Sequence, residues 1–193
     1  MRKNINIVRW AKEQASSLLP PLGDRWLHVQ GVVKRAEQVS KLFSEVDQQY
    51  LMAAAYLHDI GYSPVIKNTG FHPLDGAKYI LNNLGDMRLA ALVAHHSESR
   101  FEATLRGLSE ELDSYPCEHS AVTDALIYCD MTTNGIGRHV ILKERLADIL
   151  HRYNETDIVI RALRQARPYW ALAVARTQRR LHRYELEVGL QIN

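Results

Sequence analysis

Hydrophobic residues recur along almost the whole chain with the spacing of an amphipathic α-helix. Patterns in which polar and apolar residues alternate one by one, as in strands, are scarce. We therefore predict an all-α fold, a bundle of about eight or nine helices. The length of 193 residues fits a single domain over residues 1–193, because a core of this size is stable without disulfides or metals as staples.

Proline, glycine and capping residues indicate where these helices begin and end. Pro20–Pro21 stops a first helix that starts near Asn4, and Asp24 is placed to cap a second helix reaching about residue 43. A third helix starts near Asp47 and ends at Gly61. Further helices are predicted over about residues 72–84, 86–96, 121–133, 140–153 and 156–188, the last kinked or broken by Pro168, with a loop over 62–71 and short helical turns within 97–118.

Composition and charge narrow the classes of function. A formal net charge of +2 is too small for nonspecific binding to nucleic acid, so an anionic ligand must be bound locally. The two cysteines, Cys117 and Cys129, form no CxxC pair, which suits a reducing cytoplasm. Neither a signal-peptide pattern nor an apolar stretch of about 20 residues occurs. We predict a cytoplasmic protein that binds neither membranes nor specific nucleic acids, and a homodimeric state stays open.

Several histidine and aspartate residues stand at the ends or on the inner faces of the predicted helices. His58, His96 and Asp130 continue the apolar faces of their helices at helical spacing, so they should point into the core. His95 lies about 100° round the helix from His96. The complete set is His28, His58, Asp59, His72, His95, His96 and Asp130.

Such a set has two interpretations. A single histidine on an apolar face is more often a hydrogen-bonded core residue than a metal ligand. Buried aspartates among buried histidines, however, are costly unless a cation offsets their charge. Imidazole and carboxylate groups suit Fe, Mn, Co or Zn, and bundles hold such ions between facing helices. Spacing alone leaves both interpretations open.

Three segments carry a resemblance that favours the metal. RWLHVQGV at 25–32, HDIG at 58–61 and YCDMTT at 128–133 follow the order His, His-Asp, Asp, which resembles the HD superfamily of metal-dependent phosphohydrolases. The resemblance covers about Arg25 to Thr133 and implies an HD core at about 23–135 with flanking terminal helices. It implies that His28, His58, Asp59 and Asp130 are the primary metal ligands.

Two further segments resemble the binuclear branches of that superfamily, such as the symmetrical diadenosine tetraphosphate hydrolases. FHPLDGAKYI at 71–80 and VAHHS at 93–97 match their additional histidines. This implies a second ion held by His72, His95 and His96 with Asp59 bridging, although helical phase favours His96 over His95. One or two divalent ions are expected: Fe, Mn, Co or Zn, with Mg as a further option. Cyclic dinucleotides and guanosine alarmones are disfavoured as substrates, because the motifs typical of those branches are absent.

The resemblance implies hydrolysis of a phosphate ester or anhydride in a nucleotide or related small molecule, through a metal-activated hydroxide. Asp59 and Arg25 are the expected catalytic residues. Arg25, Lys67 and Arg100 are candidate phosphate contacts, since each is close in sequence to a predicted ligand, with surface charge as the alternative. Two other functions stay open: a diiron oxygenase of the HD type, and a non-catalytic HD module that binds a ligand.

Overall fold

The computed structural model describes residues 6–191, which form helices without any strand. The prediction of an all-α fold is therefore confirmed. Short 3₁₀ turns at Pro20–Leu22, Ile60–Tyr62 and His96–Glu98 separate some of the longer helices. The ten α-helices within 6–191 are α1 (Ile7–Leu18), α2 (Asp24–Ser40), α3 (Glu45–Leu57), α4 (His72–Leu84), α5 (Met87–Ala94), α6 (Arg100–Arg106), α7 (Ser109–Asp113), α8 (Ala121–Met131), α9 (Leu142–Arg152) and α10 (Ile158–Gln191).

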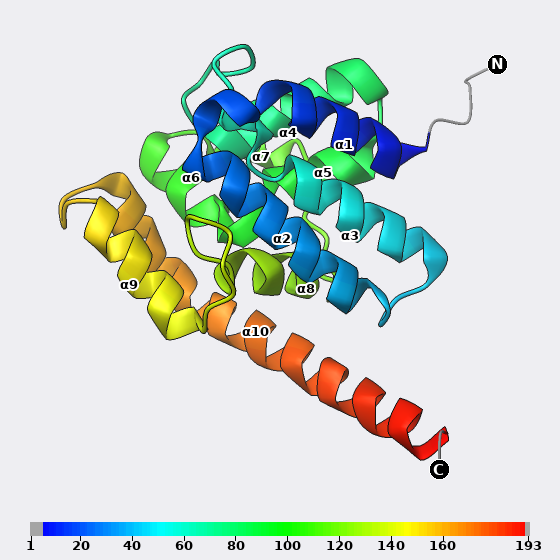
Figure 1. The fold of residues 1–193 in the computed structure, drawn as a ribbon. Helices are drawn as coiled ribbons and strands as arrows, with labels where there is room; N and C mark the ends of the chain where they lie inside the picture. The colour runs from blue at the N-terminus through cyan, green and yellow to red at the C-terminus, as the bar shows by residue number, and fades with distance from the viewer. Residues whose placement is uncertain (1–5, 192–193) are drawn as a thin grey trace.

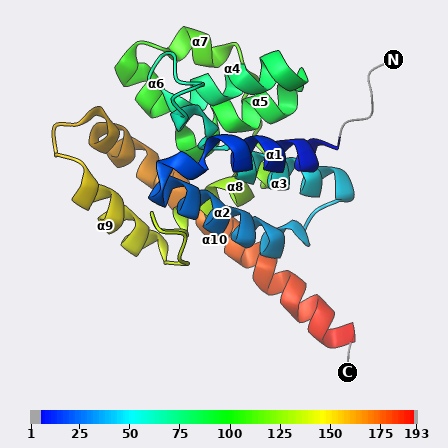
Figure 2. The ribbon, with the colours of Figure 1, turned by 45° about the horizontal axis from the view of Figure 1, so that its top comes forward.

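Helix α8 is the centre of the packing. It contacts α2 and α3 on one side and α10 on another, and all of its last seven residues, from Ala125 to Met131, are buried. Figures 1 and 2 show α2 and α3 side by side over α8, with α10 crossing beneath them and its C-terminal end projecting away from the other helices. Because α8 is buried on several faces, a charged residue near its end, Asp130, is carried into the interior.

Several helix ends differ from the sequence prediction: α3 ends at Leu57 and not at Gly61, and α5 ends at Ala94 and not at residue 96. Gly23, not Asp24, occupies the N-cap of α2, since its φ of 56° suits glycine, and Asp24 lies in the first turn. The residues before Asn6, where the first helix was predicted to begin, lie outside the described part; Asn6 caps α1 by accepting a hydrogen bond from the Arg9 backbone. The bounds of α4 are those predicted.

The prediction was that Pro168 kinks or breaks the last helix; α10 continues through Pro168, so the helix is not broken there. Pro168 lies on the exposed face of the helix, where water can bind the carbonyl group that loses its partner. On the opposite face Ala166 and Trp170 are buried against the body of the protein, and this packing holds the helix together. Within residues 6–191 no helix combines the length and the apolar character needed to cross a membrane.

The loop before α4 is fixed by one buried carboxylate. Asp75, only 2% exposed, accepts hydrogen bonds of 2.8–3.2 Å from the backbone of Asn68, Thr69 and Gly70 and from the Thr69 hydroxyl. These bonds satisfy backbone donors that a loop would otherwise leave unpaired. The loop therefore holds the start of α4, where His72 stands, in one position.

Candidate metal centre

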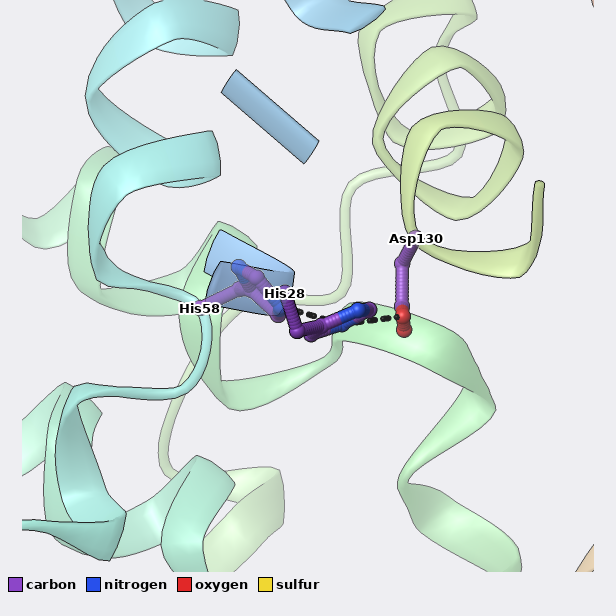
Figure 3. A group of neighbouring side chains, drawn as sticks. All are labelled: His28, His58 and Asp130. Atoms are coloured by element: carbon purple, nitrogen blue, oxygen red, sulfur yellow. Dashed lines mark hydrogen bonds and ion pairs between the residues drawn. The ribbon is translucent and has the colours of Figure 1, made fainter. Parts of the chain in front are cut away.

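The first group of ligand-type side chains comes from three helices. His28 lies on α2, His58 caps the end of α3, and Asp130 lies near the end of α8 (Figure 3). His28 Nε2 is 3.1 Å from Asp130 Oδ1 and 3.4 Å from His58 Nε2. One ligand atom from each residue lies within 4.8 Å of the others, and all three residues are buried. The packing of α8 against α2 and α3 thus builds a site that one ion could occupy.

A second group lies beside the first. It consists of Asp59, His72 at the start of α4, and His96 just after α5. His72 Nε2 is 3.2 Å from His96 Nε2 and 3.3 Å from Asp59 Oδ1. The structure therefore places six of the seven residues selected from the sequence in two adjacent groups.

Asp59 faces both groups. Its Oδ1 is 3.3 Å from His72 Nε2, whereas its Oδ2 is 3.5 Å from His58 Nε2 and 3.9 Å from His28 Nε2. A carboxylate that bridges two ions needs one oxygen directed to each side. The bridging role that the resemblance implies is compatible with this geometry.

Backbone carbonyls set the orientation of three imidazole rings. The Nδ1 atoms of His28, His58 and His96 lie 3.0, 2.9 and 2.6 Å from the carbonyl oxygens of residues 134, 55 and 93. Since a carbonyl only accepts, Nδ1 must carry the proton and the lone pair of Nε2 is left facing the group. This is the arrangement that metal-ligating histidines require, and the donor set of nitrogen and carboxylate oxygen fits divalent first-row ions.

Glycines allow the close approaches that assemble the groups. A Cβ at Gly61 would overlap the carbonyl oxygen of His72, so only glycine lets the end of α3 meet the start of α4. The loop after α8 approaches α2 equally closely. A Cβ at Gly31 would overlap the backbone of Gly137. The second approach brings the Asn134 carbonyl to His28. The glycine of the HDIG segment thus sets the distance between Asp59 and His72.

The two groups together are called the cluster below: His28, His58, Asp130, Asp59, His72 and His96. Arg25, which the sequence analysis selected, lies against this cluster. Its Nη1 donates to Asp59 Oδ2 at 2.8 Å, and its guanidinium lies 4.0 Å from the centre of the Tyr62 ring. The other side of Tyr62 stacks on His72 at 4.0 Å between ring centres. Arg25, Tyr62 and His72 therefore form a stack, which restricts the side chains beside Asp59.

The electrostatic surroundings set the protonation states that metal ligands need. Burial alone would raise the pKa of Asp59, but the charge of Arg25 and the nearby imidazoles hold it well below its ordinary value. Burial opposes ionisation of Asp130 too, and its pKa is nevertheless lowered by the adjacent His28 ring and by the charge of Arg145. Burial lowers the pKa values of His72 and His96. Charged carboxylates and neutral imidazoles are the forms that bind metal at neutral pH.

Sequence reasoning missed Arg145. This residue lies on α9, is 5% exposed, and places Nη2 3.3 Å from Asp130 Oδ1 and 3.4 Å from His28 Nε2. Its Nη1 donates to Asp148 Oδ2 at 3.0 Å. In the sequence it stands among Lys143, Glu144 and Asp148, where an arginine resembles an ordinary surface charge. Only the packing of α9 over the cluster reveals its position.

Sequence reasoning also missed Ser97. Its hydroxyl donates to Asp130 Oδ2, and its carbonyl accepts a 2.9 Å hydrogen bond from Trp170 Nε1 on α10. The backbone at Ser97 has a φ of 52°, in the left-handed region that favours glycine. Strain of this kind persists where the surroundings enforce it and is common at functional sites. In the sequence, the one feature that could have indicated a role for Ser97 is its position directly after His95 and His96.

Three predicted site residues are not brought to the cluster. His95, the C-cap of α5, is directed elsewhere, and its Nε2 donates to the Tyr115 carbonyl at 2.8 Å. Arg100 is exposed, pairs with Glu98 at 2.8 Å and lies over the Tyr169 ring. Lys67 is exposed on its loop and does not line the cavity beside the cluster. The structure thus does not bring His95, expected as a ligand, or Lys67 and Arg100, expected as phosphate contacts, to the two groups.

A cavity of about 120 Å³, the site cavity, opens on both groups. A second hollow of about 490 Å³ adjoins it, since Arg25, His28, Tyr62, Arg145 and Arg152 line both. Helices α9 and α10 form an apolar wall of the site cavity, to which Ile149, Val159, Leu163, Ala166 and Trp170 contribute. Ligands would thus meet the metal-binding groups on one side and the C-terminal helices on the other.

The fold and site define a class: an all-α protein with paired histidine and aspartate groups buried where its helices meet. The family model for the HD domain matches residues 25–129, more than half of the chain. The chain therefore belongs to the HD domain family, which consists largely of metal-dependent hydrolases. Asp130 directly follows the matched segment, and α9 and α10 lie beyond it. The comparisons with curated proteins and with solved structures found no match.

Proposed function

We propose that this protein is a metal-dependent phosphohydrolase that acts on a phosphate ester or anhydride of a small molecule, such as a nucleotide. The observation that carries the proposal is the charge balance of the site. Each buried carboxylate already has an arginine beside it, since Arg25 pairs with Asp59 and Arg145 with Asp130. The Nδ1 atoms of His28, His58 and His96 face backbone carbonyls, which directs Nε2 of each ring into the two groups. With divalent ions bound, the site would therefore stabilise a negatively charged ligand.

This balance favours an anionic substrate. Each divalent ion held by the two groups would bring positive charge that the surrounding side chains do not offset. Uncompensated charge in a buried site is costly, so an anion that enters the site cavity would be stabilised there. A phosphoryl group supplies both negative charge and several oxygen acceptors. A neutral substrate would leave the charge of the ions uncompensated.

The side chains divide the chemical tasks. Bound divalent ions supply Lewis acidity, which polarises a phosphoryl oxygen and lowers the pKa of a water molecule towards neutrality. Asp59 faces both groups and so fixes their separation. Arg25 lines the site cavity and has guanidinium donors beyond the Nη1 that Asp59 uses, so it can donate to a phosphoryl oxygen. The apolar wall of α9 and α10 excludes water from the reacting groups.

Metal analysis joined to a phosphate-release screen tests the proposal. Protein loaded with Mn, Fe, Co or Mg is assayed on a library of phosphate esters and nucleotides, with and without oxygen. We expect phosphate release under both atmospheres. Asp59→Ala should lose most bound metal and lower turnover by about 1,000-fold or more, because it removes a carboxylate of both groups. Asp113→Ala, an exposed aspartate on α7, is the matched control and should retain both properties.

Two results would contradict the proposal. Full metal content and full turnover in Asp59→Ala would show that the two groups are not the active site. Product that forms only with iron and only in air would instead support the oxygenase alternative. Equal phosphate release with and without oxygen excludes that alternative.

A further inference from the structure

Arg145 has more hydrogen-bonding capacity than its neighbours use. Its side chain is 6% exposed, and its Nε has no hydrogen-bond partner among the described residues. Leaving a buried donor unpaired costs about 1–3 kcal/mol, and burying a charge costs more unless it is compensated. The guanidinium also lines both the site cavity and the adjoining hollow. A buried cation with an unused donor at a cavity wall is suited to bind an anionic ligand.

The hydrogen bonds that Asp130 requires do not explain why Arg145 is buried beside it. Asp130 Oδ2 already accepts from the Ser97 hydroxyl, and Oδ1 lies 3.1 Å from His28 Nε2. The contact from Arg145 Nη2 is the longest of these, at 3.3 Å. Asp148 holds the other end of the guanidinium through Nη1 and also accepts from the Gly135 backbone at 3.2 Å. Arg145 is thus held in place by Asp148, a residue outside the cluster. This indicates that the guanidinium is oriented for a contact other than the one with Asp130.

We propose that Arg145 binds the phosphoryl group of the substrate together with Arg25, and that the two arginines select a terminal phosphoryl group over an internal phosphodiester. This inference rests on the proposed function. Arg25 lies against one carboxylate of the cluster and Arg145 against the other, and both line the same cavity. A terminal phosphoryl group is dianionic near neutral pH and has three non-bridging oxygens, so it can meet both arginines and the ions at once.

A phosphodiester makes the poorer ligand for the same reason. It has one negative charge and two non-bridging oxygens, which the ions alone would occupy. Its second organic group would also have to fit beside the apolar wall of α9 and α10. The chemical class expected for the substrate is therefore a phosphate monoester or the terminal phosphate of an anhydride.

The test compares Arg145→Gln and Arg145→Lys with the unmodified protein, each loaded with Mn. Substrates are 4-nitrophenyl phosphate, a monoester, and bis(4-nitrophenyl) phosphate, a diester. Binding of inorganic phosphate is measured separately by calorimetry. Arg145→Gln should weaken phosphate binding by about 10-fold or more and lower kcat/KM for the monoester by about 30-fold, as expected for loss of a charge-assisted hydrogen bond. Turnover of the diester should change by less than about 3-fold, and Arg145→Lys should restore part of the loss.

Controls separate this role from a structural one. Metal content and the midpoint of thermal unfolding should be the same in Arg145→Lys as in the unmodified protein. Arg161→Gln, an exposed arginine on α10, removes the same charge and should change neither phosphate binding nor turnover.

The outcomes distinguish the two proposals. Phosphate binding that is unaffected by Arg145→Gln, or equal losses for monoester and diester, would overturn the role of Arg145 while leaving the hydrolase proposal intact. Absence of hydrolysis of every ester by the unmodified protein would refute the proposed function. Phosphate binding that depends on Arg145 would, even then, support the anion-binding role.

Discussion

Two regions of the molecule contribute to the site in different ways. The segment matched by the HD domain family and the aspartate that follows it supply all six residues of the two metal-ligand groups. Helices α9 and α10 supply Arg145, Arg152 and the apolar wall. The first region thus supplies the candidate metal ligands, and the second supplies the arginines and the apolar wall that face them. A family match that covers only the first region can indicate a class of reaction without indicating a substrate.

The largest effect that tests this division is expected in the first region. His72→Ala removes one ligand of the second group and should leave His28, His58 and Asp130 in place. Measured metal content should fall from about two ions to about one, and activity by about 100-fold or more, because a two-metal mechanism needs both positions. Elemental analysis after anaerobic, metal-replete handling checks the stoichiometry. If the unmodified protein never binds more than one ion, the binuclear interpretation is wrong.

A second prediction concerns how the first region is assembled. Gly61→Ala should lower the free energy of unfolding by about 2–3 kcal/mol, because the added Cβ overlaps backbone that cannot move independently of α4. Metal affinity should fall with it, since His72 would shift away from Asp59. In Gly135→Ala the new Cβ meets only side-chain atoms at 3.5 Å or more, so stability should change by less than about 0.5 kcal/mol. Denaturant unfolding of both variants checks the contrast, and equal stabilities would contradict it.

The same two regions show how far the sequence could be interpreted. The helical class and the inward position of His58, His96 and Asp130 followed from hydrophobic spacing, because a residue that continues an apolar face must enter the core. The difference between His95 and His96 followed from helical phase as well. These are local properties, and neighbouring residues determine them.

The contribution of α9 and α10 could not be found in that way. Arg145 reaches the cluster through the packing of a helix more than a hundred residues away from His28, and no local pattern separates it from the surface charges around it. Pro168 does not end α10, because tertiary packing outweighed a local preference. The carbonyl of Ser97, whose backbone is strained, accepts a hydrogen bond from Trp170, which is also distant in the sequence.

A smaller effect is expected where the C-terminal region touches the site. Trp170→Phe keeps most of the apolar wall but removes the hydrogen bond to the Ser97 carbonyl. The strained turn should relax and turn Ser97 from Asp130, lowering turnover by about 3–10-fold with metal content unchanged, as for loss of a single neutral hydrogen bond. Trp10→Phe, in which a partly buried tryptophan on α1 is changed far from the cavity, is the matched control. Loss of bound metal in Trp170→Phe would show that α10 belongs to the metal site itself.

The smallest effect is expected at an ion pair of the first region that lies away from the site. Arg88 on α5 donates to both Glu118 oxygens at 2.8 Å and to Asp47 at 2.8 Å, and its hydrogen bonds lower the pKa of Glu118 below the ordinary value of 4.5. Such a carboxylate adds stability that is fully present above pH 4.5 and is lost as the pH falls through its lower value in the folded protein.

Arg88→Met should therefore lower the free energy of unfolding by about 1 kcal/mol at pH 7, because the pair is partly exposed, and by less at pH 3. Urea unfolding at the two pH values measures the difference. Metal content and turnover should not change, whereas Arg145→Gln is expected to lower turnover of the monoester. A penalty of equal size at both pH values would mean that Arg88 stabilises the protein through packing and not through its charge.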